Sequence, residues 1–252
     1  MLRLTTWLLC AIGAISARTA VGDEALVAVA ASFVPPMQAV AAAIEAETAH
    51  ALTLVPGSTG GLYAQIVNGA PFDVFVAADT ERPRLLEEGG HSVTGTRATI
   101  AVGELVLFST DVELIRGSGL DALHNDALRR IAIANPRLAP YGVAAQQALE
   151  ALGLWQTLQP KLVRGQSVAQ TFAMTATANA ELGLVALAQV RAHGESAAYV
   201  PVPDALHAPI RQDMIVLERA RNNAAAFALH DFLRSARGRE IVARFGYGTI
   251  ED

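Results

Sequence analysis

The stretch ALVAVAASFVPPMQAV, residues 25–40, predicts a buried strand that passes directly into a helix. Its first seven residues are a continuous apolar run, which is typical of a strand covered on both faces. Pro35 and Pro36 fit the first turn of a helix, where the backbone N–H has no partner within the helix. Ser32 lies between the two elements. The stretch therefore indicates an α/β unit with a hydroxyl group at the carboxyl end of its strand.

The same alternation of strand and helix patterns continues along the chain and predicts an α/β fold. A long extended run, TIAVGELVLFS at residues 99–109, has Gly103 in its middle and separates a first α/β series from a second. We expect two Rossmann-like α/β lobes, each with a parallel sheet covered by helices on both faces, joined by a two-segment hinge. Lobe 1 is predicted at residues 23–103 plus 207–252 and lobe 2 at residues 104–206, with a ligand cleft between them.

The N-terminus predicts export from the cytoplasm. Residues 1–22 have a basic start, a short apolar run and small residues near Gly22, which is the pattern of a cleavable secretory signal peptide. A lipoprotein signal ending at Cys10 is the alternative. Cys10 is the only cysteine, so the exported chain would contain no disulfide and no cysteine ligand or nucleophile. A large exported protein without disulfides is expected in the bacterial periplasm.

The net charge argues against nucleic acid as a partner. The whole chain has a formal net charge of -5, and removal of residues 1–22 takes away two arginines and no acidic residue. An acidic surface does not attract nucleic acid or an anionic membrane by bulk electrostatics.

Four predicted strand-to-helix turns share features of an anion site. Open α/β sheets bind ligands at the carboxyl ends of their strands, where helix starts present unpaired N–H groups and the positive end of the helix dipole. A site made only of such neutral donors suits a fully ionised oxyanion, because it has nothing to accept a hydrogen bond from the ligand. The four turns contain Ser32, Ser58, Tyr141 and Ser167.

Each turn alone also has an ordinary structural interpretation. Ser32 fits a helix N-cap, and GSTGG around Ser58 fits a plain turn. Pro140 and Tyr141 fit a helix start, and Ser167 with Gln170 three residues later is a capping-box pattern. The anion-site hypothesis depends on the four turns meeting in space.

The chain resembles the periplasmic molybdate-binding proteins of bacterial ABC transporters, a family of type II periplasmic solute-binding proteins. The resemblance extends over most of the chain after the signal peptide, in the family's order and spacing. It is carried by AASF (30–33), GSTGGLYAQIVNGAPFDVFVAAD (57–79), GELVLFS (103–109), IANPRLAPYGVAAQQALEALGLW (133–155) and ELGLVALAQV (181–190).

The resemblance implies a tetrahedral oxyanion held between two lobes by serine hydroxyls and main-chain N–H groups. Carried onto this chain, the serines are Ser32 and Ser58, and the main-chain donors are Tyr141 and Val168. Many members have a tyrosine where this chain has Ala186. We hypothesise that the hydroxyl of Tyr141 replaces it, and an unchanged affinity in Tyr141→Phe would refute this.

The resemblance further implies molybdate or tungstate as the ligand, without a cofactor and without a metal beyond the molybdenum of the oxyanion. The expected partners are an inner-membrane permease and its ATPase subunit, and the protein is expected to be a monomer and not an enzyme. A carrier for sulfate or another oxyanion, or a sensor outside transport, are the alternatives.

Other chemistry finds little support in the sequence. The histidines lack paired ligand spacing, and GSTG is not the G-x-S-x-G of a nucleophile elbow, so a serine hydrolase using Ser58 is a distant alternative. Asp73 and Asp79 flank one strand and would lie ~20 Å apart, too far to act together. Arg137, Arg164 and Arg211 are expected near the cleft, in solvent or in ion pairs between the lobes.

Overall fold

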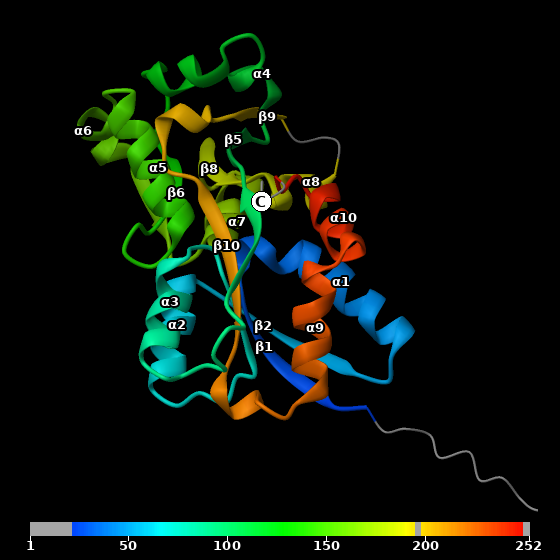
Figure 1. The fold of residues 1–252 in the computed structure, drawn as a ribbon. Helices are drawn as coiled ribbons and strands as arrows, with labels where there is room; N and C mark the ends of the chain where they lie inside the picture. The colour runs from blue at the N-terminus through cyan, green and yellow to red at the C-terminus, as the bar shows by residue number, and fades with distance from the viewer. Residues whose placement is uncertain (1–21, 195–197, 249–252) are drawn as a thin grey trace, which may run out of the picture.

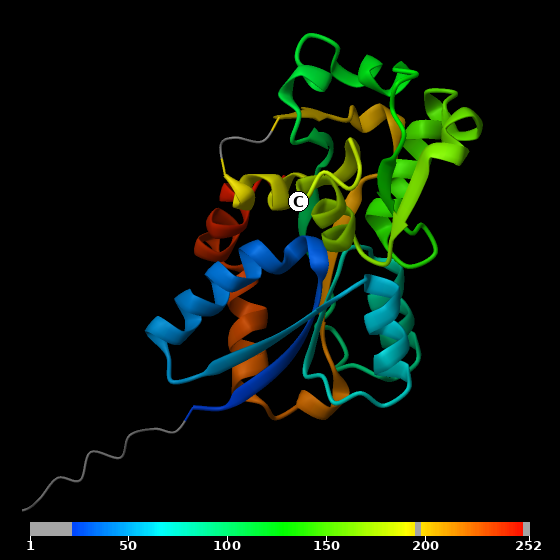
Figure 2. The same ribbon diagram turned by 180° about the vertical axis from the view of Figure 1, so that it is seen from behind.

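The computed structural model describes residues 22–194 and 198–248, so nearly all of the predicted signal peptide, residues 1–21, lies outside the described residues. Two lobes, each with its own sheet, are stacked and connected by extended segments (Figure 1). Figure 2 shows the same two layers from behind, with the helices of each lobe packed around its sheet. The predicted fold class of two α/β lobes is confirmed.

The first lobe contains a five-stranded sheet in the order β2-β1-β3-β10-β4. Its strands are β1 (Glu24–Ala30), β2 (Ala51–Gly57), β3 (Val74–Ala77), β4 (Ala98–Gly103) and β10 (Ile210–Val216). Helices α1 (Val34–Glu47), α9 (Ala224–Arg234) and α10 (Ala236–Arg244) bury one face, and α2 (Thr59–Val67) and α3 (Glu81–Glu88) bury the other. Val27 and Val29 contact the first helix group whereas Ala28 contacts the second, so β1 is apolar throughout because both of its faces are covered.

The second lobe contains a sheet in the order β7-β6-β8-β5-β9. Its strands are β5 (Leu105–Ser109), β6 (Ile131–Ala134), β7 (Leu162–Gly165), β8 (Leu182–Ala186) and β9 (Ala198–Pro201). Its helices are α4 (Val112–Ile115), α5 (Pro140–Ala151), α6 (Trp155–Leu158), α7 (Val168–Ala176) and α8 (Leu187–His193). Short 3₁₀ turns, η1 (Ala31–Phe33), η2 (Gly119–His124), η3 (Gln159–Lys161), η4 (Asp204–Leu206) and η5 (Glu218–Ala220), complete the two lobes.

One strand in each sheet runs against the others, and here the expectation of purely parallel sheets is wrong. β10 is antiparallel to β3 and β4, and β5 is antiparallel to β8 and β9. These two strands belong to the segments that cross between the lobes. A crossing segment reaches its sheet from the side where the parallel strands end, so it has to run in the opposite direction.

This topology points the carboxyl ends of β1, β2, β6 and β7 toward the junction of the lobes. The sheet strands of the first lobe lie within the residues predicted for lobe 1, and those of the second lobe within the residues predicted for lobe 2. The exact lobe boundaries stay a prediction. Within residues 22–194 and 198–248, no helix has both the length and the apolar character needed to cross a bilayer.

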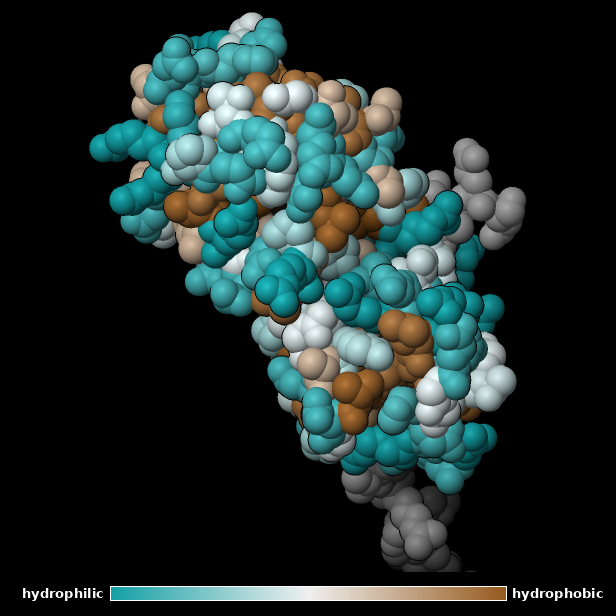
Figure 3. Space-filling model, turned by 90° about the vertical axis from the view of Figure 1, so that its left-hand side faces the viewer, coloured by the Kyte–Doolittle hydropathy of each residue, from teal (hydrophilic) through white to brown (hydrophobic). Residues whose placement is uncertain are grey.

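Figure 3 shows one side of the molecule, where hydrophilic side chains cover most of the surface and hydrophobic ones gather in small groups.

Candidate functional site

Ser32 lies in the turn between β1 and α1 and is not the cap of that helix. The chain leaves β1 at Ala30, makes the 3₁₀ turn η1 and starts α1 at Val34, with Phe33 at the N-cap and no capping side chain. Only 1% of Ser32 is exposed, and its Oγ has no hydrogen-bond partner among the described residues. A buried hydroxyl without such a partner is a donor available to a ligand.

Ser58 stands at the N-cap of α2, but its hydroxyl makes no capping bond. A Cβ at Gly61 would lie 2.9 Å from Ser58 Oγ, so the glycine leaves this hydroxyl room. The next residue, Thr59, is buried and its Oγ1 accepts a hydrogen bond of 3.1 Å from the N–H of Ala78 at the end of β3. This bond fixes the turn between β2 and α2 to the neighbouring strand β3. The Ser58 hydroxyl takes no part in capping α2.

Tyr141 is the second residue of α5, after Pro140, and the N-cap Ala139 offers no side-chain acceptor. A Cβ at Gly142 would overlap the carbonyl group of Ala134, so the start of α5 lies directly on the end of β6. N–H groups in the first turn of a helix have no partner within it, which leaves the N–H of Tyr141 as a donor at this turn.

The fourth turn confirms the predicted cap at Ser167. Ser167 is the N-cap of α7, and its Oγ accepts a hydrogen bond of 3.3 Å from the N–H of Gln170. The side-chain oxygen of Gln170 in turn accepts a hydrogen bond of 2.6 Å from the N–H of Gln166. In a standard capping box the donor would be the N–H of the N-cap residue itself, here Ser167. Val168 is the first residue of α7, so its N–H also lacks a helical partner.

The four turns converge on one small cavity between the lobes, which we call the inner cavity. Its accessible volume of about 10 Å³ is roughly that needed by one water molecule, which is too small for a sugar or a peptide. The lining residues are Ala30, Ala31, Ser32, Gly57, Ser58, Thr59, Ala78, Ala139, Pro140, Tyr141 and Val168. All four residues predicted from the sequence are among them, and no residue with a charged side chain is.

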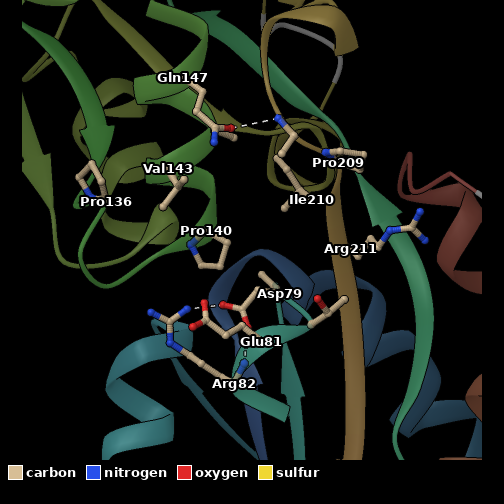
Figure 4. A pocket seen from close by; sticks show the side chains of 14 residues that line it. Asp79, Glu81, Arg82, Pro136, Pro140, Val143, Gln147, Pro209, Ile210 and Arg211 are labelled. Carbon is tan, nitrogen blue, oxygen red and sulfur yellow. Dashed lines mark hydrogen bonds and ion pairs between the residues drawn. The ribbon is translucent and has the colours of Figure 1, made fainter. Parts of the chain in front are cut away.

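A wider pocket of about 400 Å³ adjoins the inner cavity and shares Ala78 and Pro140 with it. Figure 4 shows the Asp79–Arg82 ion pair of the first lobe opposite Pro140 and Val143 of the second. At the junction of the lobes the N–H of Gly60 donates a hydrogen bond of 2.9 Å to the carbonyl oxygen of Leu138. The lobes are therefore in contact around the inner cavity.

The arginines expected near the cleft stay outside the inner cavity. Arg137, Arg164 and Arg211 are all exposed. Arg211 borders the wider pocket, and in Figure 4 its side chain points away from the other labelled side chains. The charge of a bound anion would thus be balanced by hydroxyl and N–H dipoles.

The side chain of Tyr141 reaches from the second lobe to the hinge. A Cβ at Gly103 would overlap Tyr141 Oη, so the hydroxyl lies directly against the glycine in the middle of the extended run that separates the two lobes. Burial raises the pKa of Tyr141 well above its usual 10, and the nearby Tyr247 raises it further. Ala186, at the end of β8, is fully buried and does not line the inner cavity.

Sequence reasoning missed Tyr247. Its buried hydroxyl donates a hydrogen bond of 2.8 Å to the backbone carbonyl of Ser32. Since 215 residues separate the two in the chain, no local pattern could have paired them.

The carboxylates flanking β3 serve separate ion pairs. Asp73 contacts Arg219 at 3.1 Å and accepts a hydrogen bond from the N–H of Leu26, while Asp79 pairs with Arg82. These partners support the structural role expected for both. Within the described part of the chain, no group of three or more histidine, cysteine, aspartate or glutamate side chains could hold a metal ion.

Comparison with known proteins agrees with the fold. The family model described as bacterial extracellular solute-binding protein matches residues 25–248. The molybdate-binding protein ModA of Azotobacter vinelandii is 45% identical over 96% of this chain and 96% of its own length. ModA of Rhodobacter capsulatus is 40% identical over 91% of this chain and 90% of its own. A solved structure of the Azotobacter vinelandii periplasmic molybdate-binding protein superposes with a TM-score of 0.86 at 35% identity, covering 90% of this chain and all of the other.

The chain shares its two-lobed α/β fold with solute-binding proteins. The chain belongs to the bacterial extracellular solute-binding proteins and, within them, to the family of molybdate-binding proteins.

Proposed function

We propose that this protein binds molybdate, and tungstate in the same way, and delivers it to an ABC permease driven by an ATPase subunit. The observation that carries the proposal is the convergence of four strand-to-helix turns on one uncharged cavity of compact size. The relatives named molybdate-binding protein support molybdate as the ligand of that cavity.

The proposed ligand contacts are the hydroxyl groups of Ser32 and Ser58 and the main-chain N–H groups of Tyr141 and Val168. Ser32 and Ser58 belong to the first lobe, and Tyr141 and Val168 to the second. A ligand that bonds to both lobes favours the closed arrangement over an open one, and this difference is what a permease can recognise.

Donor chemistry disfavours protonated ligands, while size separates the remaining ones. Phosphate carries protons at neutral pH, and within the inner cavity its O–H groups could donate only by turning a serine hydroxyl from donor to acceptor. Sulfate offers the same charge and shape as molybdate but is smaller. We propose that the cavity dimensions favour molybdate and tungstate over sulfate.

The proposed location is the periplasm, following cleavage near Gly22, with no cofactor and a monomeric protein. Its relatives are binding proteins, and we propose that no covalent step occurs here either. The lining of the inner cavity supports this, because neither a histidine nor an acidic residue is available beside Ser58 to act as its base.

A thermal-shift titration with molybdate, tungstate, sulfate and phosphate at equal ionic strength tests the proposal. Ligand at about 100 times its dissociation constant adds about 2.7 kcal/mol to the free energy of unfolding, which raises the melting temperature visibly. We expect large shifts with molybdate and tungstate only. A shift confined to sulfate would change the substrate, and no shift with any of the four would refute the anion site.

A further inference from the structure

The residue that carries a further inference is Tyr247, which follows α10 near the end of the described chain. Its side chain is buried, and its hydroxyl donates to the Ser32 carbonyl oxygen at 2.8 Å. Its ring meets that of Phe33 edge-on, with 4.9 Å between the centroids and 65° between the planes. One side chain thus holds two consecutive residues of the first site turn.

The backbone around Tyr247 is fixed to the hinge strand. Gly248 donates a hydrogen bond of 2.8 Å to the Val102 carbonyl oxygen, and the N–H of Val102 donates one of 3.1 Å back to Gly248. Val102 is next to Gly103, where the chain leaves the first lobe. Tyr247 is therefore anchored one residue from the crossing point and reaches from there to Ser32.

Tyr141 approaches the same place from the second lobe. Its Oη lies against Gly103. Burial raises the pKa of both tyrosines, and the neighbouring Tyr247 raises the pKa of Tyr141 further, whereas the hydrogen bond with Tyr141 lowers the pKa of Tyr247. The Ser32 turn, the hinge strand and the second lobe therefore meet around two phenol groups.

The direction of the Ser32 carbonyl matters for an anion. If the Ser32 carbonyl oxygen turned toward the inner cavity, it would repel a dianion there. The cavity would then present an acceptor at this turn in place of the donating Ser32 hydroxyl. The bond from Tyr247 turns this oxygen toward the hinge, while Ser32 Oγ remains without a partner among the described residues.

We propose that Tyr247 is a positioning residue of the oxyanion site, whose hydroxyl holds the Ser32 carbonyl away from the inner cavity so that the Ser32 hydroxyl faces the ligand. This inference rests on the proposed function of the cavity. It assigns Tyr247 no contact with the ligand, and its effect on binding passes through Ser32.

The test compares Tyr247→Phe with the native protein in titrations with molybdate, well below the melting temperature of both. Phenylalanine keeps the ring against Phe33 and removes only the hydroxyl. We expect the dissociation constant to rise about tenfold. The control is Tyr199→Phe, because Tyr199 is 39% exposed on β9, and its affinity should stay within twofold of the native value.

A double variant separates positioning from a general loss of stability. If Tyr247 acts through Ser32, Tyr247→Phe combined with Ser32→Ala should bind only about as weakly as Ser32→Ala alone. If the two residues acted independently, the fold-losses in affinity of the two single variants would multiply instead. Multiplied losses, or a Tyr247→Phe variant that melts earlier but binds molybdate with native affinity, would overturn the proposal.

A measurement without ligand tests the role of Tyr247 independently of the proposed function. Hydrogen exchange of the segment around residues 31–34 should be several-fold faster in Tyr247→Phe than in the native protein and in Tyr199→Phe. A native protein that binds none of the four oxyanions would refute the proposed function, and the exchange rates would still decide whether Tyr247 holds the Ser32 turn. Unchanged exchange would refute that role.

Discussion

At the scale of single residues, Ser32 and Ser58 are distinguished from other serines by what their hydroxyls do not contact. The hydroxyl of Ser167 caps a helix and that of Ser235 caps another, whereas neither Ser32 nor Ser58 makes a capping bond to the helix it precedes. The sequence could place all of these serines at helix starts. It could not separate a cap from a free donor, because a helix-start pattern does not show which N–H groups the serine hydroxyl reaches.

Ser58→Ala should weaken molybdate binding tenfold or more while leaving the protein without ligand as stable as before. A hydrogen bond to a charged group contributes about 1.5–3 kcal/mol, and about 1.4 kcal/mol corresponds to a factor of ten in affinity. Stability should not change because the hydroxyl makes no capping bond to lose. Calorimetric titration measures the affinity, and thermal unfolding measures the stability.

The control for this substitution is Ser92→Ala. Ser92 is also buried, and its Oγ is likewise without a partner among the described residues, but it does not line the inner cavity. Its loss should leave the affinity unchanged. Equal effects of both substitutions would mean that Ser58 is not a ligand contact.

The affinity for molybdate should be constant within about threefold between pH 6 and pH 9. Tyr141 is the one lining residue of the inner cavity with an ionisable side chain, and burial raises its pKa well above 10, so it stays neutral over this range. Titrations at several pH values and constant ionic strength measure this. A steep change within the range would mean that a titrating group contacts the ligand.

At the scale of secondary structure elements, the strands and helices that follow strong apolar patterns could be predicted closely. The sequence predicted one helix start at Pro140 and Tyr141 and another at the Ser167 cap, and the structure has α5 at Pro140–Ala151 and α7 at Val168–Ala176. The reversed strands β5 and β10 could not be predicted, because periodicity carries no information about strand direction. Their direction depends on the path of the chain between the lobes.

Ser167→Ala should lower the free energy of unfolding by about 1 kcal/mol, as expected for the loss of an N-cap side chain. The same change should reduce the affinity for molybdate less than Ser58→Ala does, because the N–H of Val168 remains and only the start of α7 loosens. Denaturant unfolding and titration measure the two effects. Thr157→Ala is the control: Thr157 is exposed on α6 and its hydroxyl makes no hydrogen bond among the described residues, so stability should change by no more than about 0.5 kcal/mol. A loss of binding as large as that of Ser58→Ala would point to a direct contact of Ser167 with the ligand.

At the scale of the whole molecule, the inner cavity exists only because the two lobes meet. The residues of the first lobe that line it lie at or after the ends of β1, β2 and β3, and those of the second follow β6 and β7. The apolar core of the second lobe even includes Ala30, Ala31 and Ala78 of the first. The sequence predicted which turns contribute, whereas Tyr247 and its contact with Ser32 depend on the return of the chain across the hinge and have no local pattern.

Gly103→Ala should weaken molybdate binding at least tenfold by opposing closure. A methyl group at Gly103 would overlap Tyr141 Oη and would lie 3.1 Å from Tyr141 Cζ and 3.2 Å from Gln212 Nε2, and Tyr141 belongs to the opposite lobe. An open arrangement that moves Tyr141 away removes the overlap, so the melting temperature without ligand should change little. Titration gives the affinity, and small-angle X-ray scattering gives the decrease in radius of gyration when molybdate saturates the native protein.

Adding Tyr141→Phe to Gly103→Ala tests whether the contact between these two residues is the cause of the weaker binding. The proposed ligand contact of Tyr141 is its N–H and not its hydroxyl, so Tyr141→Phe removes only the oxygen atom with which the new methyl group overlaps. Gly103→Ala with Tyr141→Phe should therefore bind molybdate more tightly than Gly103→Ala alone. Recovery should be partial, because Tyr141 Cζ and Gln212 Nε2 remain close. The double variant could bind molybdate no more tightly than Gly103→Ala, while both variants show the same decrease in radius of gyration on binding as the native protein. In that case the contact between Gly103 and Tyr141 does not control closure.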